Sequence, residues 1–255
     1  LIESCGARHI LVTRGGEGMS LVSSEGAPVH LPALAREIFD VSGAGDTVVA
    51  VLATGLAAGM SIAEAAQLAN IAASLVVAKV GTAVVRNAEL ADAVDAAASI
   101  PDKIVDQKRL AEQVAQWRSR GLTVGFTNGC FDLVHPGHIS LLEQAKSASD
   151  RLIVGLNSDA SVTRLKGEGR PVQDAAARGL VLASVAAVDV VVVFDDDTPL
   201  ELIRQIRPDV LVKGEDYELD AVVGGDIVEA YGGRVVLADL VDGFSTTATI
   251  QRLVR

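Results

Sequence analysis

The chain has 255 residues, of which 49% are hydrophobic and 22% are charged, and its net charge at pH 7 is −11. This composition supports a buried core and excludes a disordered chain. The negative charge disfavours a nucleic-acid binder, and an aromatic content of 3% disfavours base-stacking surfaces. Cys5 and Cys130 are too few for a disulfide framework, so we expect a reducing, cytoplasmic location.

The sequence predicts neither a membrane-spanning helix nor a targeting segment. Its longest uncharged run, residues 47–63, is shorter than the roughly 20 apolar residues that a spanning helix needs. The chain begins at Leu1 rather than at a methionine. We therefore expect it to be a fragment of a longer protein.

The first 100 residues contain both strand and helix patterns. Apolar runs at 9–13 and 19–23 predict strands, and helical patterns follow at 44–58, 62–79 and 88–97. The stretch Ser99–Lys108 is polar, contains a proline and lacks a clear period, which predicts a linker. We therefore divide the chain into domains at 1–100 and 101–255.

Residues 101–255 alternate regularly between short apolar runs and helical patterns. This alternation predicts a parallel sheet covered on both faces. The expected fold class is α/β, with a five-stranded parallel, Rossmann-like second domain that binds its ligand at the carboxyl ends of the strands. Strands are predicted at 123–126, 152–156, 188–194, 210–212 and 235–237, and helices at 137–148, 174–186, 199–206, 224–231 and 246–254.

The segment Thr127-Asn-Gly-Cys-Phe-Asp-Leu-Val-His-Pro-Gly-His138 follows the first of these strands and begins a helix. A helix N-terminus offers unpaired N–H groups and a partial positive charge, both of which favour phosphate. Imidazole donors from His135 and His138 would stabilise the charge that builds up on a phosphoryl group in transit. By itself the pattern also fits two surface histidines at a helix cap. Its place after the first strand of the domain favours a phosphate site.

On these residues the second domain resembles the cytidylyltransferase-like family of nucleotidyltransferases, whose signature is H-x-G-H. Leu156–Asp159, Arg164–Val172, Val212–Tyr217 and Phe244–Thr247 resemble further motifs of that family. The resemblance implies that His135, His138 and Lys166 are catalytic, that ATP is a substrate, and that its phosphates carry Mg²⁺. It also implies nucleotide binding by Thr127, Asn128, Gly129, Phe131, Gly137, Asn157, Asp159, Arg170, Lys213, Gly214, Asp216, Ser245, Thr246 and Thr247.

Basic residues are concentrated between positions 146 and 178 of a domain that is acidic overall. Such a cluster fits a triphosphate pocket, although solvated loop charges are the ordinary alternative. Asp132 is predicted to be an orienting or capping residue rather than a catalytic acid. No aspartate pair is close enough in sequence to form a metal cage, so no metal ligand is predicted. The cluster consists of Lys146, Arg151, Arg164, Lys166, Arg170 and Arg178.

A second phosphate motif, Asp40-Val-Ser-Gly-Ala-Gly-Asp-Thr47, precedes the first long helix. Gly43, Ala44 and Gly45 would place backbone N–H groups at the helix start, and Asp46 would accept the proton of an attacking hydroxyl. Together with Val12–Gly18, the motif resembles the ribokinase-like (phosphofructokinase-B) carbohydrate kinases. The resemblance covers only the carboxyl-terminal third of such a kinase, so Asp46 is a catalytic candidate but we expect no sugar phosphorylation by this chain.

The order of the two motifs resembles the bifunctional bacterial enzymes of ADP-heptose synthesis. It implies that AMP is joined to D-glycero-β-D-manno-heptose 1-phosphate for the lipopolysaccharide core. Two alternatives stay open: another nucleotidyltransferase, such as a glycerol-3-phosphate cytidylyltransferase, and a non-catalytic nucleotide-binding or dimerisation module. We expect small-molecule substrates and neither nucleic acid nor a membrane as partner. A truncated parallel sheet in the first domain would leave an unpaired edge, which predicts a homo-oligomer.

Overall fold

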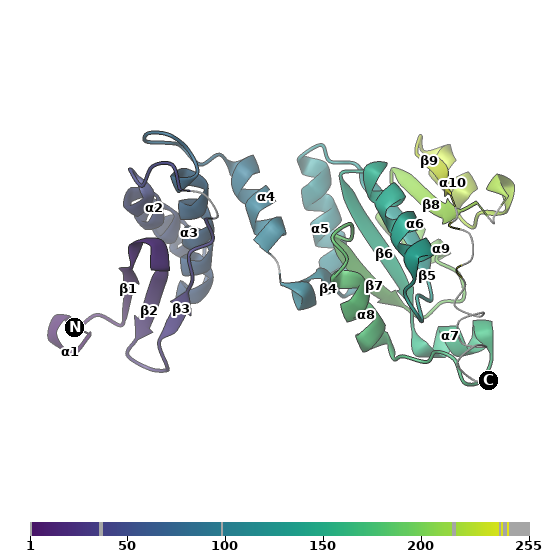
Figure 1. The fold of residues 1–255 in the computed structure, drawn as a ribbon, viewed down its shortest axis with the longest axis horizontal. Coiled ribbons are helices and arrows are strands. Elements are labelled where there is room, and N and C mark those ends of the chain that lie inside the picture. The colour runs from purple at the N-terminus through teal and green to yellow at the C-terminus, as the bar shows by residue number, and fades with distance from the viewer. Residues whose placement is uncertain are drawn as a thin grey trace. The chain divides into compact units, whose positions relative to one another are not determined.

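The computed structural model describes residues 2–35, 38–97, 99–215, 218–239, 241 and 244. The chain divides into two compact units, Leu1–Ala98 and Ser99–Arg255, and each is described by itself (Figure 1). No helix among the described residues is long and apolar enough to cross a membrane.

The sheet of the first unit is antiparallel. Its strands β1 (His9–Thr13), β2 (Met19–Ser23) and β3 (Val29–Leu31) lie in the order β1-β2-β3. Only five residues connect β1 to β2, too few for the crossover that parallel neighbours require. The expected truncated parallel sheet is therefore wrong for this part of the chain, although both strands predicted here are present.

Helices complete the first unit: α1 (Ile2–Cys5), α2 (Ala44–Ala57), α3 (Ile62–Val77) and α4 (Asn87–Ala97). The α3 helix begins at a capping box in which the Ser61 hydroxyl and the Glu64 carboxylate satisfy each other's backbone N–H groups. The first two long helices, α2 and α3, pack closely, since a Cβ atom at Gly55 would lie 3.1 Å from that of Ala65. Small side chains thus allow a compact layer whose core contains Met19, Leu31, Val48, Ala66 and Ala69.

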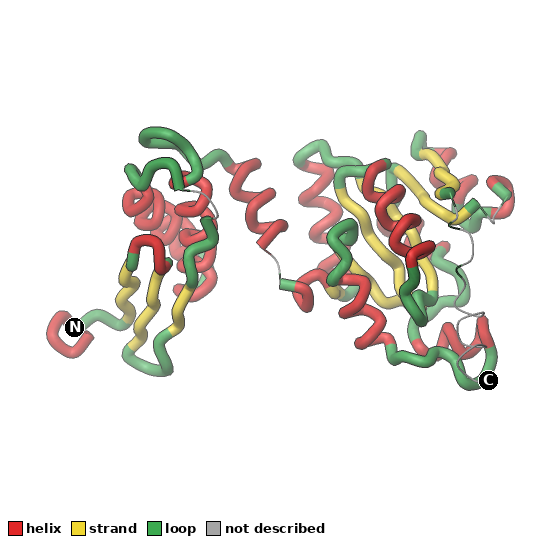
Figure 2. The backbone as a smooth tube through the Cα atoms, in the orientation of Figure 1, coloured by secondary structure: helices red, strands yellow, loops and turns green. Residues whose placement is uncertain are grey.

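The second unit is a parallel sheet between helices (Figure 2). The strand order is β4-β7-β6-β5-β8-β9, so the first long strand, β5, lies between β6 and β8. The strands are β4 (Ile104–Val105), β5 (Val124–Gly129), β6 (Arg151–Asn157), β7 (Val190–Phe194), β8 (Val210–Gly214) and β9 (Arg234–Ala238). The helices are α5 (Gln107–Ser119), α6 (Pro136–Ser147), α7 (Asp159–Lys166), α8 (Ala175–Ala183), α9 (Leu200–Ile206) and α10 (Gly225–Ala230).

Two apolar clusters fill the faces of this sheet. Side chains of α5, α9 and α10 pack in one cluster with Phe126, and side chains of α6 and α8 pack in the other with Val154. Both clusters consist mainly of fully buried aliphatic residues, as a parallel sheet covered on both faces requires. The α/β class predicted from the alternating pattern is confirmed.

The segment predicted as a linker is instead part of the second unit. Ser99 forms a capping box with Asp102 at the start of a short 3₁₀ helix (Ile100–Lys103), and β4 then pairs with β7 at the edge of the sheet. The five predicted strands are present, and β4 adds a sixth. Because β4 is only two residues long and is flanked by polar residues, it gives no strand pattern in the sequence.

The structure also contains helices that the pattern analysis missed. In α5 the buried side chains are Leu110, Val114 and Trp117, whose spacing follows one face of a helix and could have predicted it. The α7 helix is short and mostly polar, so its sequence carries little periodicity. The helix predicted at 246–254 lies outside the described residues.

Candidate active site

The paired histidines lie where β5 leads into α6, at the carboxyl edge of the second unit's sheet. His135 is the N-cap residue of α6, and its Nδ1 accepts a hydrogen bond of 3.4 Å from the backbone N–H of His138. The two imidazole rings stack, with centroids 3.8 Å apart. The close approach depends on Gly137, since a Cβ atom there would lie 3.2 Å from two atoms of the His135 ring.

Both imidazoles are held in their neutral form. Burial, and to a smaller extent the neighbouring His135, lower the pKa of His138 to about 4, although a hydrogen bond with the Leu133 backbone partly opposes the shift. Burial also lowers the pKa of His135. A neutral imidazole still carries one N–H donor, so each ring can donate one hydrogen bond to a phosphate oxygen at neutral pH.

The connection between β5 and the histidines is fixed by two buried side chains. Phe131 has a left-handed backbone with φ of 44°, and its ring packs against His138 with centroids 5.0 Å apart. The carboxylate of Asp132 is almost fully buried and accepts hydrogen bonds from Arg170 Nε at 2.6 Å and from the backbone N–H of Val172 at 2.7 Å. Asp132 thus orients a second loop, as its sequence position predicted.

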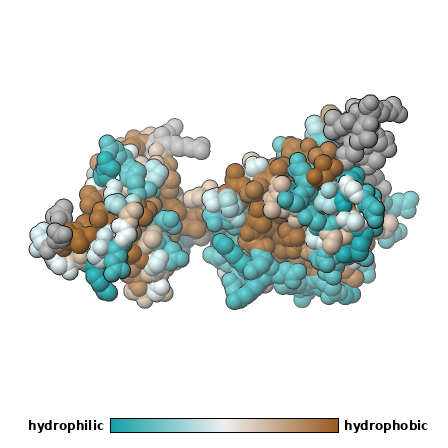
Figure 3. Space-filling model, turned by 90° about the horizontal axis from the view of Figure 1, so that it is seen from below, coloured by the Kyte–Doolittle hydropathy of each residue, from teal (hydrophilic) through white to brown (hydrophobic). Residues whose placement is uncertain are grey.

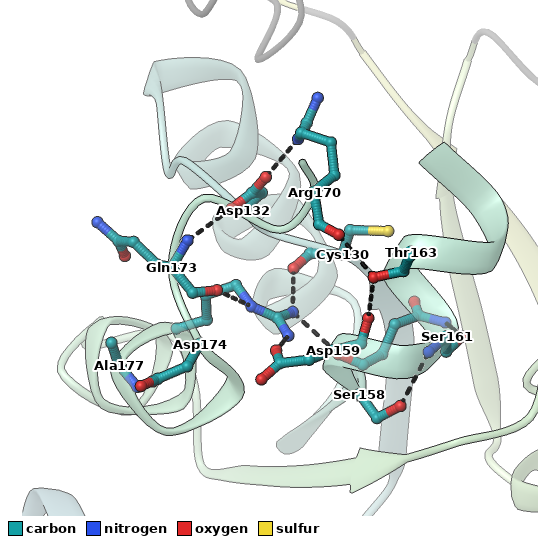
Figure 4. Close-up of polar contacts among 12 residues, drawn as sticks. Cys130, Asp132, Ser158, Asp159, Ser161, Thr163, Arg170, Gln173, Asp174 and Ala177 are labelled. Carbon is teal, nitrogen blue, oxygen red and sulfur yellow. Dashed lines mark hydrogen bonds and ion pairs between the residues drawn. The ribbon is translucent and has the colours of Figure 1, made fainter. Parts of the chain in front are cut away.

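The carboxyl end of β6 contributes a polar turn beside the histidine segment. Ser158 is the N-cap of α7, and the Asn157 amide donates a hydrogen bond of 3.0 Å to the Ser161 hydroxyl. Asp159, the first residue of α7, forms an ion pair of 2.6 Å with Arg178 (Figure 4). The amide of Asn157 and one carboxylate oxygen of Asp159 therefore have partners within the protein.

The carboxyl end of β8 joins the same edge. Lys213 Nζ donates hydrogen bonds to the side-chain oxygen of Asn128 and, at 3.2 Å, to the Asn128 carbonyl. Thr127, Asn128 and Gly129 are the last residues of β5, and Lys213 and Gly214 the last of β8. These residues belong to the strands rather than to the turns in which the sequence placed them, because the ladder continues up to the last polar positions.

The predicted basic cluster separates into groups with different surroundings. Lys146 bonds to Asp189 just before β7, and Arg151 begins β6, so both lie at the amino edge of the sheet, away from the histidines. Their assignment to a triphosphate pocket is therefore wrong. Spacing along the chain could not show this, because a strand carries residues only a few positions apart to opposite edges of the sheet.

The remaining four basic residues lie near the carboxyl edge. Arg164 pairs with Asp197, Arg170 with Asp132, and Arg178 is fully buried. Lys166, at the end of α7, is exposed and has no side-chain partner among the described residues. It nevertheless lies near Cys130, where its charge opposes the burial that raises the pKa of the thiol. Lys166 is thus available to a phosphate beside the histidine segment.

Some predicted site residues cannot be placed. Asp216, Ser245, Thr246 and Thr247 lie outside the described residues. Phe244, which precedes them, stacks near His135 with ring centroids 6.4 Å apart. This contact brings the described part of the carboxyl-terminal segment to the histidines.

The phosphate motif of the first unit forms a helix start of its own. Gly43 is the N-cap of α2 with φ of 81°, and Asp46 lies exposed in the first turn. The Asp40 carboxylate accepts hydrogen bonds from the backbone N–H groups of Ser42 at 2.8 Å and Gly81 at 3.1 Å, which lower its pKa. Asp40 therefore links the segment before the Gly43-Ala44-Gly45 turn to the loop at Gly81, which is distant in sequence.

Within the described residues, we find no metal site and no phosphate-binding cavity that would indicate a different active centre. Within the described residues, no group of three or more His, Cys, Asp or Glu side chains could hold a metal ion. A cavity of about 410 Å³ beside α9 is lined partly by carboxylates, which repel phosphate. Its lining residues are Gln107, Asp196, Glu201, Leu202, Arg204 and Gln205.

Comparisons with known proteins divide the chain in the same way. Residues 126–252 match the cytidylyltransferase-like family, and residues 1–88 match the pfkB family of carbohydrate kinases. The bifunctional protein HldE of Paramagnetospirillum magneticum is 59% identical over 255 residues, which cover 99% of this chain and 52% of that protein. HldE of Caulobacter vibrioides is 60% identical over 250 residues, covering 97% and 52%. The chain thus spans about half the length of the curated relatives it matches.

Several solved structures align with parts of the chain. The lipopolysaccharide core biosynthesis protein from Thermoplasma volcanium is 24% identical, and the alignment covers 48% of this chain and 98% of that one with a TM-score of 0.40.

Proposed function

Because residues 1–88 belong to the pfkB family of carbohydrate kinases and residues 126–252 to the cytidylyltransferase-like family, we propose that this chain transfers AMP from ATP to a sugar 1-phosphate. The proposal assigns the transfer to domain 101–255 and a kinase-type segment to domain 1–100. The observation that carries it is the stacked pair of neutral histidines, His135 and His138, at the start of α6. Two donors at a helix N-terminus fit a phosphoryl group that gains charge as it reacts.

The proposed reaction uses the groups that the candidate site contains. An oxygen of the sugar phosphate attacks the α-phosphorus of ATP, the bond from that phosphorus to the bridging oxygen breaks, and pyrophosphate leaves. His135 and His138 donate hydrogen bonds to the α-phosphate oxygens, and Lys166 stabilises the charge on the departing pyrophosphate. Mg²⁺ enters with the triphosphate as part of the substrate. No nucleophilic side chain is needed, because the acceptor itself attacks.

The proposed acceptor is D-glycero-β-D-manno-heptose 1-phosphate, which would give ADP-heptose. The order of the two phosphate motifs, which resembles the bifunctional enzymes of ADP-heptose synthesis, supports this choice, as do relatives that are named as bifunctional proteins. We assign the nucleotide site to the carboxyl edge of β5, β6 and β8, with Asp216 and Ser245–Thr247 included on the motif resemblance alone. A cytoplasmic location is part of the proposal, since ATP and sugar phosphates are cytosolic substrates.

A homo-oligomer also belongs to this proposal. Several large apolar side chains of the second unit are exposed, including Ile100, Leu180 and Val181, and Figure 3 shows apolar surface on this unit beside polar surface. Exposed apolar surface favours protein contacts. Light scattering after gel filtration would test it, and a monomeric mass would contradict it.

Pyrophosphate release is the direct test of the reaction. The protein would be incubated with ATP, CTP, GTP or UTP and with a panel of sugar 1-phosphates that includes the heptose compound, with glycerol 3-phosphate as the alternative acceptor. We expect turnover with ATP and heptose 1-phosphate. Turnover with CTP and glycerol 3-phosphate would favour the cytidylyltransferase alternative. Nucleotide binding without turnover on any acceptor would favour the non-catalytic one.

A further inference from the structure

Arg178 is a charged side chain buried completely inside the second unit. It lies in α8, and its guanidinium group donates hydrogen bonds in four directions. Nη1 bonds to the carbonyl of Cys130 at 2.6 Å and to that of Asn157 at 2.9 Å. Nε bonds to the carbonyl of Gln173 at 3.0 Å, and Nη2 to the carboxylate of Asp159 at 2.6 Å (Figure 4).

These partners lie in or next to three loops of the candidate site. Cys130 lies in the turn that leads to the paired histidines, Asn157 ends β6 and Asp159 begins α7 on either side of Ser158, and Gln173 lies in the loop that carries Arg170. The planar guanidinium fork holds several acceptors in fixed directions, which a lysine ammonium cannot do. One side chain therefore sets the positions of all three loops relative to one another.

Asp132 forms a second link between the histidine turn and the Arg170 loop. Asp132, two residues after Cys130, accepts hydrogen bonds from Arg170 and from the backbone N–H groups of Val172 and Gln173. The histidine turn and the Arg170 loop are thus joined on one side by Asp132 and on the other by Arg178. Relative movement of the two loops requires breaking both sets of hydrogen bonds.

Stability alone is a weak reason to bury this charge. Removing an arginine from water carries a large desolvation cost, and a buried ion pair often stabilises no better than an apolar side chain of similar size. Asp159, its ion-pair partner, is itself 48% exposed. Arg178 also cannot touch substrate, since its side chain is 0% exposed and its nitrogens already bond within the protein.

We infer that Arg178 is a positioning residue for nucleotidyl transfer, which fixes the turn before His135 and His138 against the carboxyl end of β6 and the Arg170 loop. The inference rests on the proposed function for its kinetic consequence. Its structural consequence, a fixed histidine turn, is independent of the substrate.

The kinetic test compares Arg178→Lys with Arg118→Lys. Arg118 also donates hydrogen bonds to backbone carbonyls, those of Ile206 and Arg207, but between α5 and the end of α9, away from the histidines. A small misplacement of reacting groups can cost about 10²-fold in rate. We expect Arg178→Lys to lower kcat for pyrophosphate release by about that factor with little change in the ATP KM, and Arg118→Lys to retain kcat.

Chemical rescue separates positioning from folding. Arg178→Ala leaves a guanidinium-shaped space, so millimolar methylguanidine should restore part of kcat, whereas methylamine should not. If Arg178→Ala does not fold, the kinetics of Arg178→Lys and the histidine resonances described below decide between positioning and folding. Unchanged kcat in Arg178→Lys, or an effect confined to the ATP KM, would overturn the inference.

Histidine NMR provides the readout that needs no substrate. The chain has four histidines, and His9 and His30 lie in the first unit, where they serve as internal references. Arg178→Lys should shift the ring resonances of His135 and His138 and leave the other two unchanged. If the wild-type protein turns over no sugar phosphate, the proposed function fails, but these resonances still decide whether Arg178 positions the turn. Unshifted His135 and His138 resonances would refute it.

Discussion

The rings of His135 and His138 stack with a centroid separation of 3.8 Å and an angle of 19° between their planes. Two protonated imidazoles could not share this geometry without strong repulsion, and the depressed pKa values of both rings agree with a neutral pair. The pair therefore acts through N–H donors rather than through formal positive charge. Its contribution should depend on placement more than on pH near neutrality.

Replacing His138 should affect the transition state more than substrate binding. Loss of one preorganised donor typically costs about 10²–10³-fold in turnover, so we expect His138→Ala to lower kcat by that factor with a modest change in the ATP KM. Steady-state pyrophosphate kinetics measure both constants. His30→Ala, in the first unit, is the control and should retain kcat. A rise in KM alone would identify His138 as an ordinary binding group.

The partly buried His138 should also make stability depend on pH. Its pKa of about 4 in the folded protein lies below the ordinary value of 6.5, so protons bind more tightly to the unfolded chain. The contribution of His138 to the free energy of unfolding is therefore fully present above pH 6.5 and is lost as the pH falls towards 4. This contribution amounts to about 3 kcal/mol. Urea unfolding of wild type and His138→Gln across this range measures it. The variant should lose less stability on acidification, and parallel curves would contradict the assignment.

Two lysines from the predicted basic cluster should behave differently. Lys166 is exposed at the carboxyl edge, so Lys166→Met should lower kcat/KM for ATP at least about 10-fold, through loss of a charge that stabilises phosphate. Lys146 pairs with Asp189 at the amino edge, so Lys146→Met should retain kcat/KM and lose no more than about 1 kcal/mol of stability. Equal kinetic losses in the two variants would refute the division of the cluster.

The Gly137→Ala variant tests whether the position of the His135 ring beside His138 matters for catalysis. In Gly137→Ala the new methyl group would lie 3.2 Å from the His135 ring, so the ring must move by a few tenths of an ångström. We expect kcat to fall about 10-fold or more with little loss of stability, since misplaced donors stabilise the transition state poorly. Thermal unfolding and pyrophosphate release measure the two effects. Gly16→Ala, where no atom lies within 4 Å of the new methyl group, is the control and should retain kcat.

The half-buried thiol near the site should be dispensable. Burial raises the pKa of Cys130 above its ordinary value, against the opposing charges of Lys166, Arg178 and Arg170, so the thiolate needed for nucleophilic attack is scarce at neutral pH. Cys130→Ala should therefore retain most of the turnover. Mass spectrometry of the wild-type protein with ATP should show no nucleotidyl adduct. Loss of turnover together with a trapped adduct on Cys130 would contradict direct transfer.

Features carried by neighbouring residues could be predicted from the sequence. The apolar strand runs and the helical periods fix the α/β class, since each depends on spacing along one element. The H-x-G-H turn follows β5 directly, so its place at a helix start is also a local property. The missed helix α5 also left a local signal, the spacing of Leu110, Val114 and Trp117 along one face.

The roles of the basic residues depended on tertiary structure. Lys146, Arg151, Lys166 and Arg178 lie close together in the sequence, but two reach the amino edge of the sheet, one is exposed beside the histidine turn, and one is buried beneath it. Spacing along the chain cannot distinguish these roles. Strand order and helix packing across the whole sheet decide which edge of the sheet a side chain reaches and how deeply it is buried. The amino-acid sequence by itself determined which chemistry the domain contains. The order β4-β7-β6-β5-β8-β9 decided which of its charges meet the histidines.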